Sequence, residues 1–221
     1  MTERKPTLRD QQRAATRRVI QAHAVRLFTD RGYDTVTVAE VAEAAGVSAM
    51  TVYRHFPTKE DLVLVDRPAL LIAEKVAASP PGLPVVRRVA GALVEAAGVL
   101  TGGGEEGGRA ADERFLLDCL RLMIATPALR ARHLDSQYAL QQAVVEALGH
   151  DAADQDAAFG ARAATGACLA AMHTALTQWA EDDGRTALPA LIARALTASF
   201  GDVLAGGPGE GGGPAAPPGT G

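Results

Sequence analysis

Apolar residues recur along most of this chain at intervals of three and four, the spacing that predicts amphipathic helices. The first such segment runs from about residue 10 to residue 30, and Gly32 follows it. We expect the buried stripe of this helix to consist of Ala15, Val19, Ala22, Val25 and Phe28. The pattern therefore opens with one long helix.

Two short helices are predicted next, over residues 38–45 and 49–55, and a longer one over residues 58–78. Each is preceded by a residue that favours a helix N-cap: Thr37, Ser48 and Thr58. Thr37 and Glu40 have the spacing of a capping box. The breaks between segments coincide with Gly46, Pro57 and the Ser-Pro-Pro-Gly run at 79–82.

The rest of the chain continues as helices separated by short breaks. The predicted segments are 84–100, a Gly-rich loop at 101–108, 109–125, 127–148, 153–180 and 189–204. The last segment, 205–221, has 12 Gly or Pro among its 17 residues, and we expect it to be disordered. The chain is thus predicted to be all-α, with an N-terminal three-helix domain over 1–57 and a C-terminal helical bundle over 58–204.

Composition agrees with helices and adds an uneven distribution of charge. Aromatic residues make up only 4% of the chain, and the formal net charge is −4. Residues 1–31 nevertheless carry eight basic side chains against three acidic ones, whereas residues 67–221 carry 12 against 17. The asymmetry favours an N-terminal segment that meets a polyanion. A solvated basic helix face is the alternative. The absence of Asn and the predominance of Arg over Lys indicate a GC-rich, bacterial coding sequence.

Signals for catalysis, metal binding or membrane insertion are missing from the sequence. Cys119 and Cys168 stand singly in apolar stretches, so we expect reduced, buried thiols in a cytoplasmic protein. Gly102, Gly104 and Gly107 spell GxGxxG, but the loop would follow a helix, and its glutamates would repel a phosphate. We therefore expect no enzyme activity, no cofactor and no metal, and no association with a membrane.

The segment 38–55 carries the clearest functional pattern, two short helices joined by Gly46, Val47 and Ser48. Glycine suits the left-handed turn of a helix-turn-helix. We expect Val41, Ala42, Val47 and Val52 to hold the two helices together. The residues predicted to face outward are Ala49, Met50, Thr51, Tyr53 and His55. Because the major groove admits one helix, the second helix is the candidate for reading DNA.

About 50 consecutive residues resemble the N-terminal domain of the TetR family of transcriptional regulators. The positions that carry the resemblance are Leu27-Phe28, Gly32-Tyr33, Thr37, Val41-Ala42, Ala45-Gly46-Val47-Ser48, Val52-Tyr53, His55-Phe56 and Lys59-Glu60. The C-terminal part resembles the family only in the number and lengths of its helices. The resemblance implies an effector-binding and dimerisation bundle there.

Carried over by position, the resemblance makes residues 48–55 the recognition helix, with Ser48 at its start. It implies that four residues contact the DNA backbone: Thr37, Tyr53, His55 and Lys59. It also implies that Ala49, Met50 and Thr51 read bases. Arg54 is the one arginine of this helix and a further candidate for DNA contact. Arg4, Lys5, Arg9 and Arg13 form a basic arm that is expected to reach the neighbouring groove or backbone. Disorder without DNA contact is the alternative for the arm.

Within the predicted bundle, two polar residues interrupt an apolar stripe. His133 and Gln137 share a helix face with Leu129, Leu140 and Val144, and they are either hydrogen-bonded core residues or donors in a ligand pocket. The full set of candidate ligand-binding residues is Phe115, Cys119, Met123, His133, Gln137, Tyr138, Met172, His173 and Trp179. The run of small residues over 160–171 suits close helix packing, which the resemblance assigns to a homodimer interface.

Together these features predict a homodimeric DNA-binding regulator, a repressor that a small-molecule effector releases from a palindromic operator. Two alternatives stay open on the sequence alone. One is a helical-bundle carrier or enzyme with a vestigial helix-turn-helix domain. The other is a sequence-independent nucleoid protein, which the net negative charge disfavours because such binders rely on neutralising phosphates.

Overall fold

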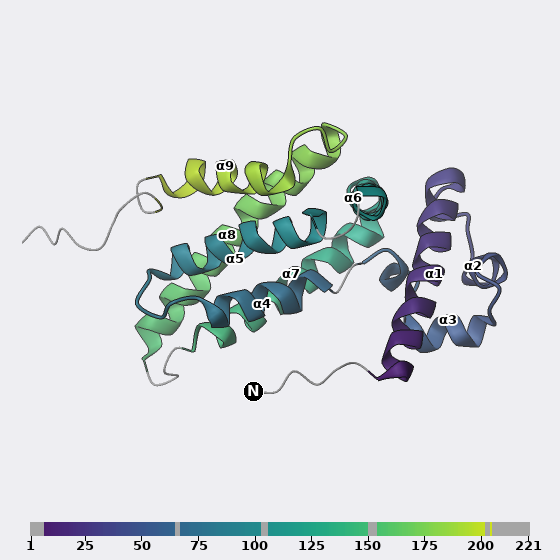
Figure 1. Ribbon diagram of the computed structural model, residues 1–221, viewed down its shortest axis with the longest axis horizontal. Coiled ribbons are helices and arrows are strands. Elements are labelled where there is room, and N and C mark those ends of the chain that lie inside the picture. The colour runs from purple at the N-terminus through teal and green to yellow at the C-terminus, as the bar shows by residue number, and fades with distance from the viewer. Residues whose placement is uncertain (1–6, 65–66, 103–105, 150–153, 202–203, 205–221) are drawn as a thin grey trace, which may run out of the picture.

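The structure is a computed structural model that describes residues 7–64, 67–102, 106–149, 154–201 and 204 (Figure 1). Within these ranges the regular structure is helical throughout, which confirms the predicted all-α class. The elements are α1 (Leu8–Arg31), α2 (Val38–Ala44), α3 (Ala49–His55), the 3-10 turn η1 (Glu60–Leu62), α4 (Arg67–Ala78), α5 (Val85–Gly102), α6 (Glu106–Ala125), α7 (Pro127–Leu148), α8 (Gln155–Glu181) and α9 (Leu188–Phe200). The predicted tail at 205–221 and the arm residues Arg4 and Lys5 lie outside the described residues.

Helices α1, α2 and α3 form a small domain around a shared apolar core. Phe28, Val36, Val41, Val52 and Phe56 are all fully buried or nearly so. Such burial at the crossing of α2 and α3 confirms the predicted packing of the helix-turn-helix.

The predicted buried stripe of α1 was wrong over its first half. Ala15, Val19 and Ala22 are exposed, and the residues that α1 buries are Ile20, Gln21, Ala24, Val25 and Phe28. The physical reason is that α2, η1 and α6 pack on the face of α1 that carries Ile20, Gln21 and Ala24, whereas Ala15, Val19 and Ala22 lie on the opposite face.

Local hydrogen bonds explain where the short helices begin and end. Thr37 and Glu40 form the predicted capping box, with the Thr37 N–H donating to Glu40 at 2.8 Å and the Glu40 N–H donating to Thr37 Oγ1 at 3.3 Å. Gly46 has a φ of +67°, a left-handed conformation that other residues adopt only at a cost. The turn between α2 and α3 therefore depends on glycine.

The helix predicted over 58–78 is divided in two. Thr58 and Asp61 do cap each other, since the Thr58 N–H donates to Asp61 at 3.0 Å and the Asp61 N–H donates to Thr58 at 3.3 Å. The turn that they start nevertheless ends at Leu62, and α4 begins at Arg67. Leu62 and Val63 are buried in the core of the N-terminal domain. Because these two residues are anchored in that core, the turn at η1 does not continue into α4 as one helix.

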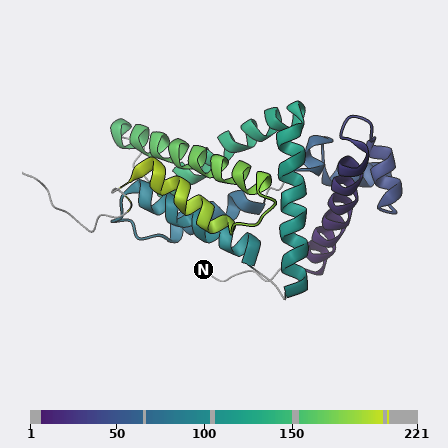
Figure 2. The ribbon, with the colours of Figure 1, turned by 90° about the horizontal axis from the view of Figure 1, so that it is seen from above.

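Helices α4 to α9 form the larger, C-terminal part. Helices α4, α5, α7, α8 and α9 pack on one another, and α6 stands between this bundle and α1, across the other helices (Figures 1 and 2). The Gly-rich loop expected at 101–108 is shorter than predicted, because α5 extends to Gly102 and α6 already begins at Glu106. None of the described helices combines the length and the apolar character that a membrane crossing requires.

Candidate nucleic-acid interface and ligand cavity

One side of the short helix α3 is exposed to solvent. Ser48 caps it, with its Oγ accepting the Thr51 N–H at 3.1 Å, as the sequence predicted. Met50 is 77% exposed and Tyr53 is 50% exposed, Arg54 is also exposed, and Ala49 and Thr51 are half-buried beside them. The structure therefore brings five of the predicted contact residues onto one short helix in positions that a groove can reach.

His55 was predicted to face outward with them, and this was wrong. Its side chain is only 9% exposed, and its Nδ1 is buried without a hydrogen-bond partner among the described residues. Arg17 lies against the same corner, donating to the His55 carbonyl oxygen at 2.6 Å while its guanidinium carbon lies 4.2 Å from the centre of the Phe56 ring. The end of α3 is thus held against α1 by its last residues.

Burial, followed by the charges of Arg13, Arg54 and Arg17, lowers the pKa of His55 below its ordinary value of 6.5. The folded protein therefore binds a proton at this site less readily than the unfolded chain does. We expect the free energy of unfolding to be insensitive to this group well above pH 6.5 and to decrease as the pH falls below it. Urea unfolding between pH 8 and pH 5 measures the effect. His55→Gln should flatten the decline, and an unchanged slope in that variant would contradict this assignment.

Lys59 was also expected at the DNA backbone, and the structure shows that its ammonium group has partners within the protein. Its Nζ donates to the Tyr33 carbonyl oxygen at 2.5 Å and lies 4.2 Å from the centre of the Tyr33 ring. Tyr33 in turn donates from its hydroxyl to Glu60 at 3.0 Å. Lys59 therefore ties the segment after α3 to the end of α1, whatever else it contacts.

The basic arm is only partly described. Arg9 and Arg13 are exposed on the first turns of α1, which starts at Leu8 under a capping box of Thr7 and Asp10. Both residues thus belong to a helix instead of an extended arm. Thr37, the cap of α2, is exposed.

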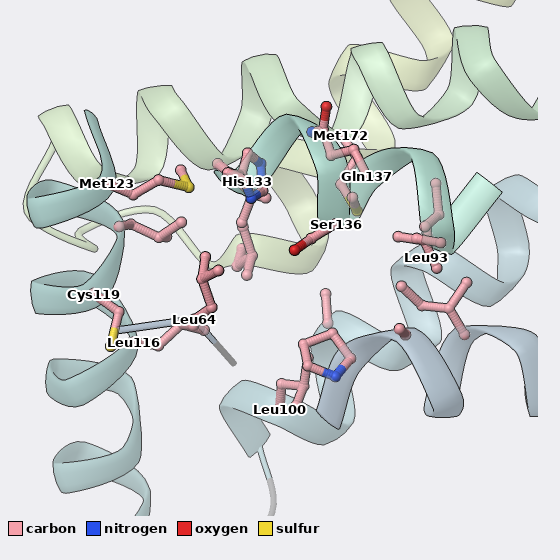
Figure 3. Close-up of a pocket in the computed structure, with 18 of the residues that line it drawn as sticks. Leu64, Leu93, Leu100, Leu116, Cys119, Met123, His133, Ser136, Gln137 and Met172 are labelled. Carbon is pink, nitrogen blue, oxygen red and sulfur yellow. The ribbon is translucent and has the colours of Figure 1, made fainter. Parts of the chain in front are cut away.

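A second candidate site is a cavity of about 330 Å³ in the C-terminal part (Figure 3). Its walls come from the segment after η1 and from α4 to α9, with α6 on one side and α7 above (Figure 3). The lining residues are Val63, Leu64, Pro68, Ala69, Ile72, Leu93, Ala97, Leu100, Leu116, Cys119, Leu120, Met123, His133, Ser136, Gln137, Ala139, Leu140, Met172, Leu176, Leu188 and Ile192. The volume and the apolar lining are typical of a small-molecule site.

The cavity includes five of the nine residues that the sequence suggested for ligand binding: Cys119, Met123, His133, Gln137 and Met172. The other four lie elsewhere. Phe115 packs against the core of the N-terminal domain, and Trp179 is 2% exposed in the core of the bundle. Tyr138 is 66% exposed on the outer side of α7, and His173 stacks beside His133 without lining the cavity. Helical spacing alone therefore did not distinguish residues that line the cavity from residues of the packed cores.

Sequence reasoning missed the α4 and α5 walls and Ser136. Ile72, Leu93, Ala97 and Leu100 are apolar positions whose spacing is the same for a packed core and a cavity wall. Ser136 lies one turn after His133 on α7, and that spacing was the available signal.

The polar side of the cavity is uncharged near neutral pH. The rings of His133 and His173 stack with centres 5.5 Å apart and planes 29° from parallel. Burial, and then the proximity of His173, lowers the pKa of His133. Burial also raises the pKa of the Cys119 thiol to about 12, so that this wall residue stays protonated. Among the described residues no cluster of three or more potential metal ligands occurs.

The cavity directly adjoins the core of the N-terminal domain. Val63 and Cys119 line the cavity and belong to that core at the same time. The Gln21 amide of α1 donates to the Leu64 carbonyl oxygen at 3.1 Å, and Arg132 of α7 pairs with Asp61 of η1 at 3.2 Å. The cavity wall and the connection to α1 therefore share the segment after η1.

Comparison with known proteins adds two family matches. Residues 20–65 match the family described as bacterial regulatory proteins, tetR family, and residues 104–200 match the MftR C-terminal domain. The chain is 32% identical over 133 residues to the HTH-type transcriptional regulator TcmR of Streptomyces glaucescens, across 58% of this chain and 57% of TcmR. It is 49% identical over 43 residues to an uncharacterized HTH-type transcriptional regulator of Mycobacterium tuberculosis, across 20% of this chain and 21% of that one. The chain thus spans little more than half of one curated relative and a fifth of the other.

Two solved structures share the fold at low sequence identity. NalD, the secondary repressor of the MexAB-OprM multidrug efflux pump in Pseudomonas aeruginosa, aligns with a TM-score of 0.50 at 20% identity, over 86% of this chain and 96% of that one. FadR from Bacillus subtilis, solved in complex with stearoyl-CoA, aligns with a TM-score of 0.51 at 18% identity, over 83% and 98%. Both support the arrangement of a helix-turn-helix domain on a helical bundle.

Proposed function

Because the chain belongs to the TetR family of bacterial regulatory proteins, we propose that it is a transcriptional repressor that a small-molecule effector releases from a palindromic operator. The observation that carries this proposal is the sharing of Val63 and Cys119 between the cavity wall and the core of the helix-turn-helix domain. Such a protein acts on DNA, so we expect it to work in the cytoplasm.

For the DNA side, we propose that α3 enters the major groove. Met50 and Thr51, near its N-terminus, are suited to apolar contact with thymine methyl groups, and Tyr53 is suited to phosphate. Arg54 and the α1 residues Arg9 and Arg13 would add contacts to the backbone whose strength depends on salt. His55 and Lys59 would act mainly by fixing α3, since their side chains are already held within the domain.

For the assembly, we propose a homodimer built on α8 and α9. A stripe of exposed small residues runs along α8 and includes Gly160, Ala163, Ala167 and Ala170, with Phe159 exposed at 67% beside it. Small side chains permit close helix approach, and a two-fold dimer matches a palindromic site.

Release would follow from movement of η1 and its connection to α4. Because η1 and α4 are separate elements, the moving unit would be the segment of Leu62 to Leu64, whose first two residues are buried and whose last carbonyl oxygen accepts from Gln21. An effector that occupies the cavity more tightly when this segment is displaced shifts the population toward the geometry that does not fit DNA.

Titration of the full chain against the DNA upstream of its own coding sequence tests the proposal. We expect binding at least 1,000-fold tighter than to a shuffled duplex of the same length and composition, within the roughly 10³–10⁷ range of specific regulators. Equal affinity for the two duplexes would instead favour a nucleoid protein. No binding to either would favour a carrier or an enzyme.

A further inference from the structure

The cavity has one polar turn in an otherwise apolar wall, and that turn carries no charge. Its polar lining residues are His133, Ser136 and Gln137, all on α7 at the spacing of one helical turn. No Arg, Lys, Asp or Glu is among the described lining residues. A carboxylate, phosphate or ammonium group taken into the apolar part of this space would lose its hydration and gain no opposite charge from the described lining, which is strongly unfavourable.

Two arginines next to lining residues have described side chains, Arg132 and Arg121, and both are already paired. Arg132 precedes His133 and bridges Asp61 at 3.2 Å. Arg121 follows Leu120, pairs with Asp183 and lies 3.7 Å from Asp118. Moving either cation into the cavity would break its ion pair. Neither is therefore placed to balance an anionic ligand.

The polar turn offers both donors and acceptors to a ligand. The Nε2 atom of His133 is buried and has no hydrogen-bond partner among the described residues. Ser136 lies at the exposed edge of the cavity, where its hydroxyl donates to the Arg132 carbonyl oxygen at 3.2 Å and keeps its lone pairs for a ligand. Figure 3 shows this hydroxyl in the space between α7 and the residues of α4 to α6. The side-chain nitrogen of Gln137 lies 3.4 Å from His173 Nδ1, which leaves one of its N–H groups and its carbonyl oxygen for a ligand. A ligand with a hydroxyl group, which both donates and accepts, satisfies this turn.

We propose that the cavity accepts an uncharged, largely apolar alcohol or phenol whose hydroxyl group hydrogen-bonds to the α7 turn of His133, Ser136 and Gln137. The inference rests on the proposed function only in taking this molecule as the effector. The apolar remainder of the molecule would lie against Leu93 and Leu100 of α5 and Leu116 and Met123 of α6.

Two matched pairs of probes test the charge preference at pH 7.5: 1-decanol with decanoate, and 2-naphthol with 2-naphthoate. Affinities for the full chain are measured by calorimetry without DNA. In every pair that binds, we expect the uncharged member to bind at least tenfold tighter. A carboxylate that binds within tenfold of its partner, or the absence of binding by all four probes, would overturn the proposal.

Variants of α7 separate this cavity from general hydrophobic binding. Ser136→Lys puts a cation on the lining and should shift the preference at least tenfold toward the carboxylate. Gln142→Lys makes the same charge change at an exposed position of α7 that does not line the cavity, and should leave the preference unchanged. Ser136→Ala should weaken binding of the uncharged probe by roughly threefold to tenfold, the value of one hydrogen bond. If Ser136→Lys leaves the preference as in the wild type, or Ser136→Ala leaves the affinity unchanged, the assignment is wrong.

These measurements are independent of operator binding. If the expected preference appears while the chain binds no DNA specifically, the proposed function fails and the ligand class stands. If specific DNA binding is found while the carboxylates bind as well as the alcohols, the ligand class fails alone.

Discussion

Thr51→Glu is expected to weaken operator binding by roughly 100-fold, which is about 3 kcal/mol. Thr51 lies on the first turn of α3, beside the exposed side chains of Met50 and Tyr53. A carboxylate there faces the acidic groove and its phosphates, while the contact of the threonine methyl group is lost. Fluorescence anisotropy with the DNA upstream of the gene measures the change.

The same substitution should leave the fold intact, which makes the test specific. Ser48 already caps α3, and glutamate three residues later completes a capping box and places a negative charge at the N-terminus of the helix. Gln142→Glu on exposed α7 is the matched control, with the same charge change and wild-type affinity expected. If Thr51→Glu binds within threefold of the wild type, α3 does not read DNA in the proposed way.

Phe28→Ala should reduce the free energy of unfolding by about 3–5 kcal/mol. Phe28 is 1% exposed, and its ring centre lies 5.0 Å from that of Tyr33. It belongs to the same core as Val41, Val52 and Phe56, so the cavity left behind opens directly under the helix-turn-helix. Urea unfolding at a fixed protein concentration, followed by circular dichroism, gives the value.

A matched change on the same helix controls for helix propensity. Val19 is 48% exposed on α1, and Val19→Ala is expected to alter the free energy of unfolding by no more than about 0.5 kcal/mol. A loss below 1 kcal/mol for Phe28→Ala would show that the small domain does not depend on this core.

Local signals predicted the helices well because capping and periodicity act within a few residues. The capping residues Thr37 and Ser48 and the left-handed Gly46 occupy the positions that the sequence indicated. The break after Leu62 escaped prediction because its cause is tertiary: Leu62 and Val63 are buried by residues of α1 that are distant in the sequence. The error in the stripe of α1 has the same origin, since periodicity does not reveal which face of a helix its partner helices cover.

Residues of the candidate sites could be predicted where a polar side chain interrupted an apolar helix face. His133 and Gln137 stood out on an apolar stripe, and both line the cavity. Trp179 and Phe115 were also candidates, yet Trp179 belongs to the core of the bundle and Phe115 packs against the core of the N-terminal domain. His55 was expected to face outward from its position in the TetR-family pattern. Its burial at the end of α3, where Arg17 contacts the His55 carbonyl oxygen and the Phe56 ring, is a tertiary effect that the pattern does not contain.

Selection from a random duplex library tests the central claim most directly. The full chain is incubated with the library at moderate salt, and the bound DNA is sequenced over successive rounds. A dimer with two copies of α3 predicts enrichment of one inverted repeat whose half-sites are about one helical turn, or 34–36 Å, apart. Selected DNA that shows no common sequence, or a single unrepeated site, would contradict the account of a two-fold regulator that reads a palindrome.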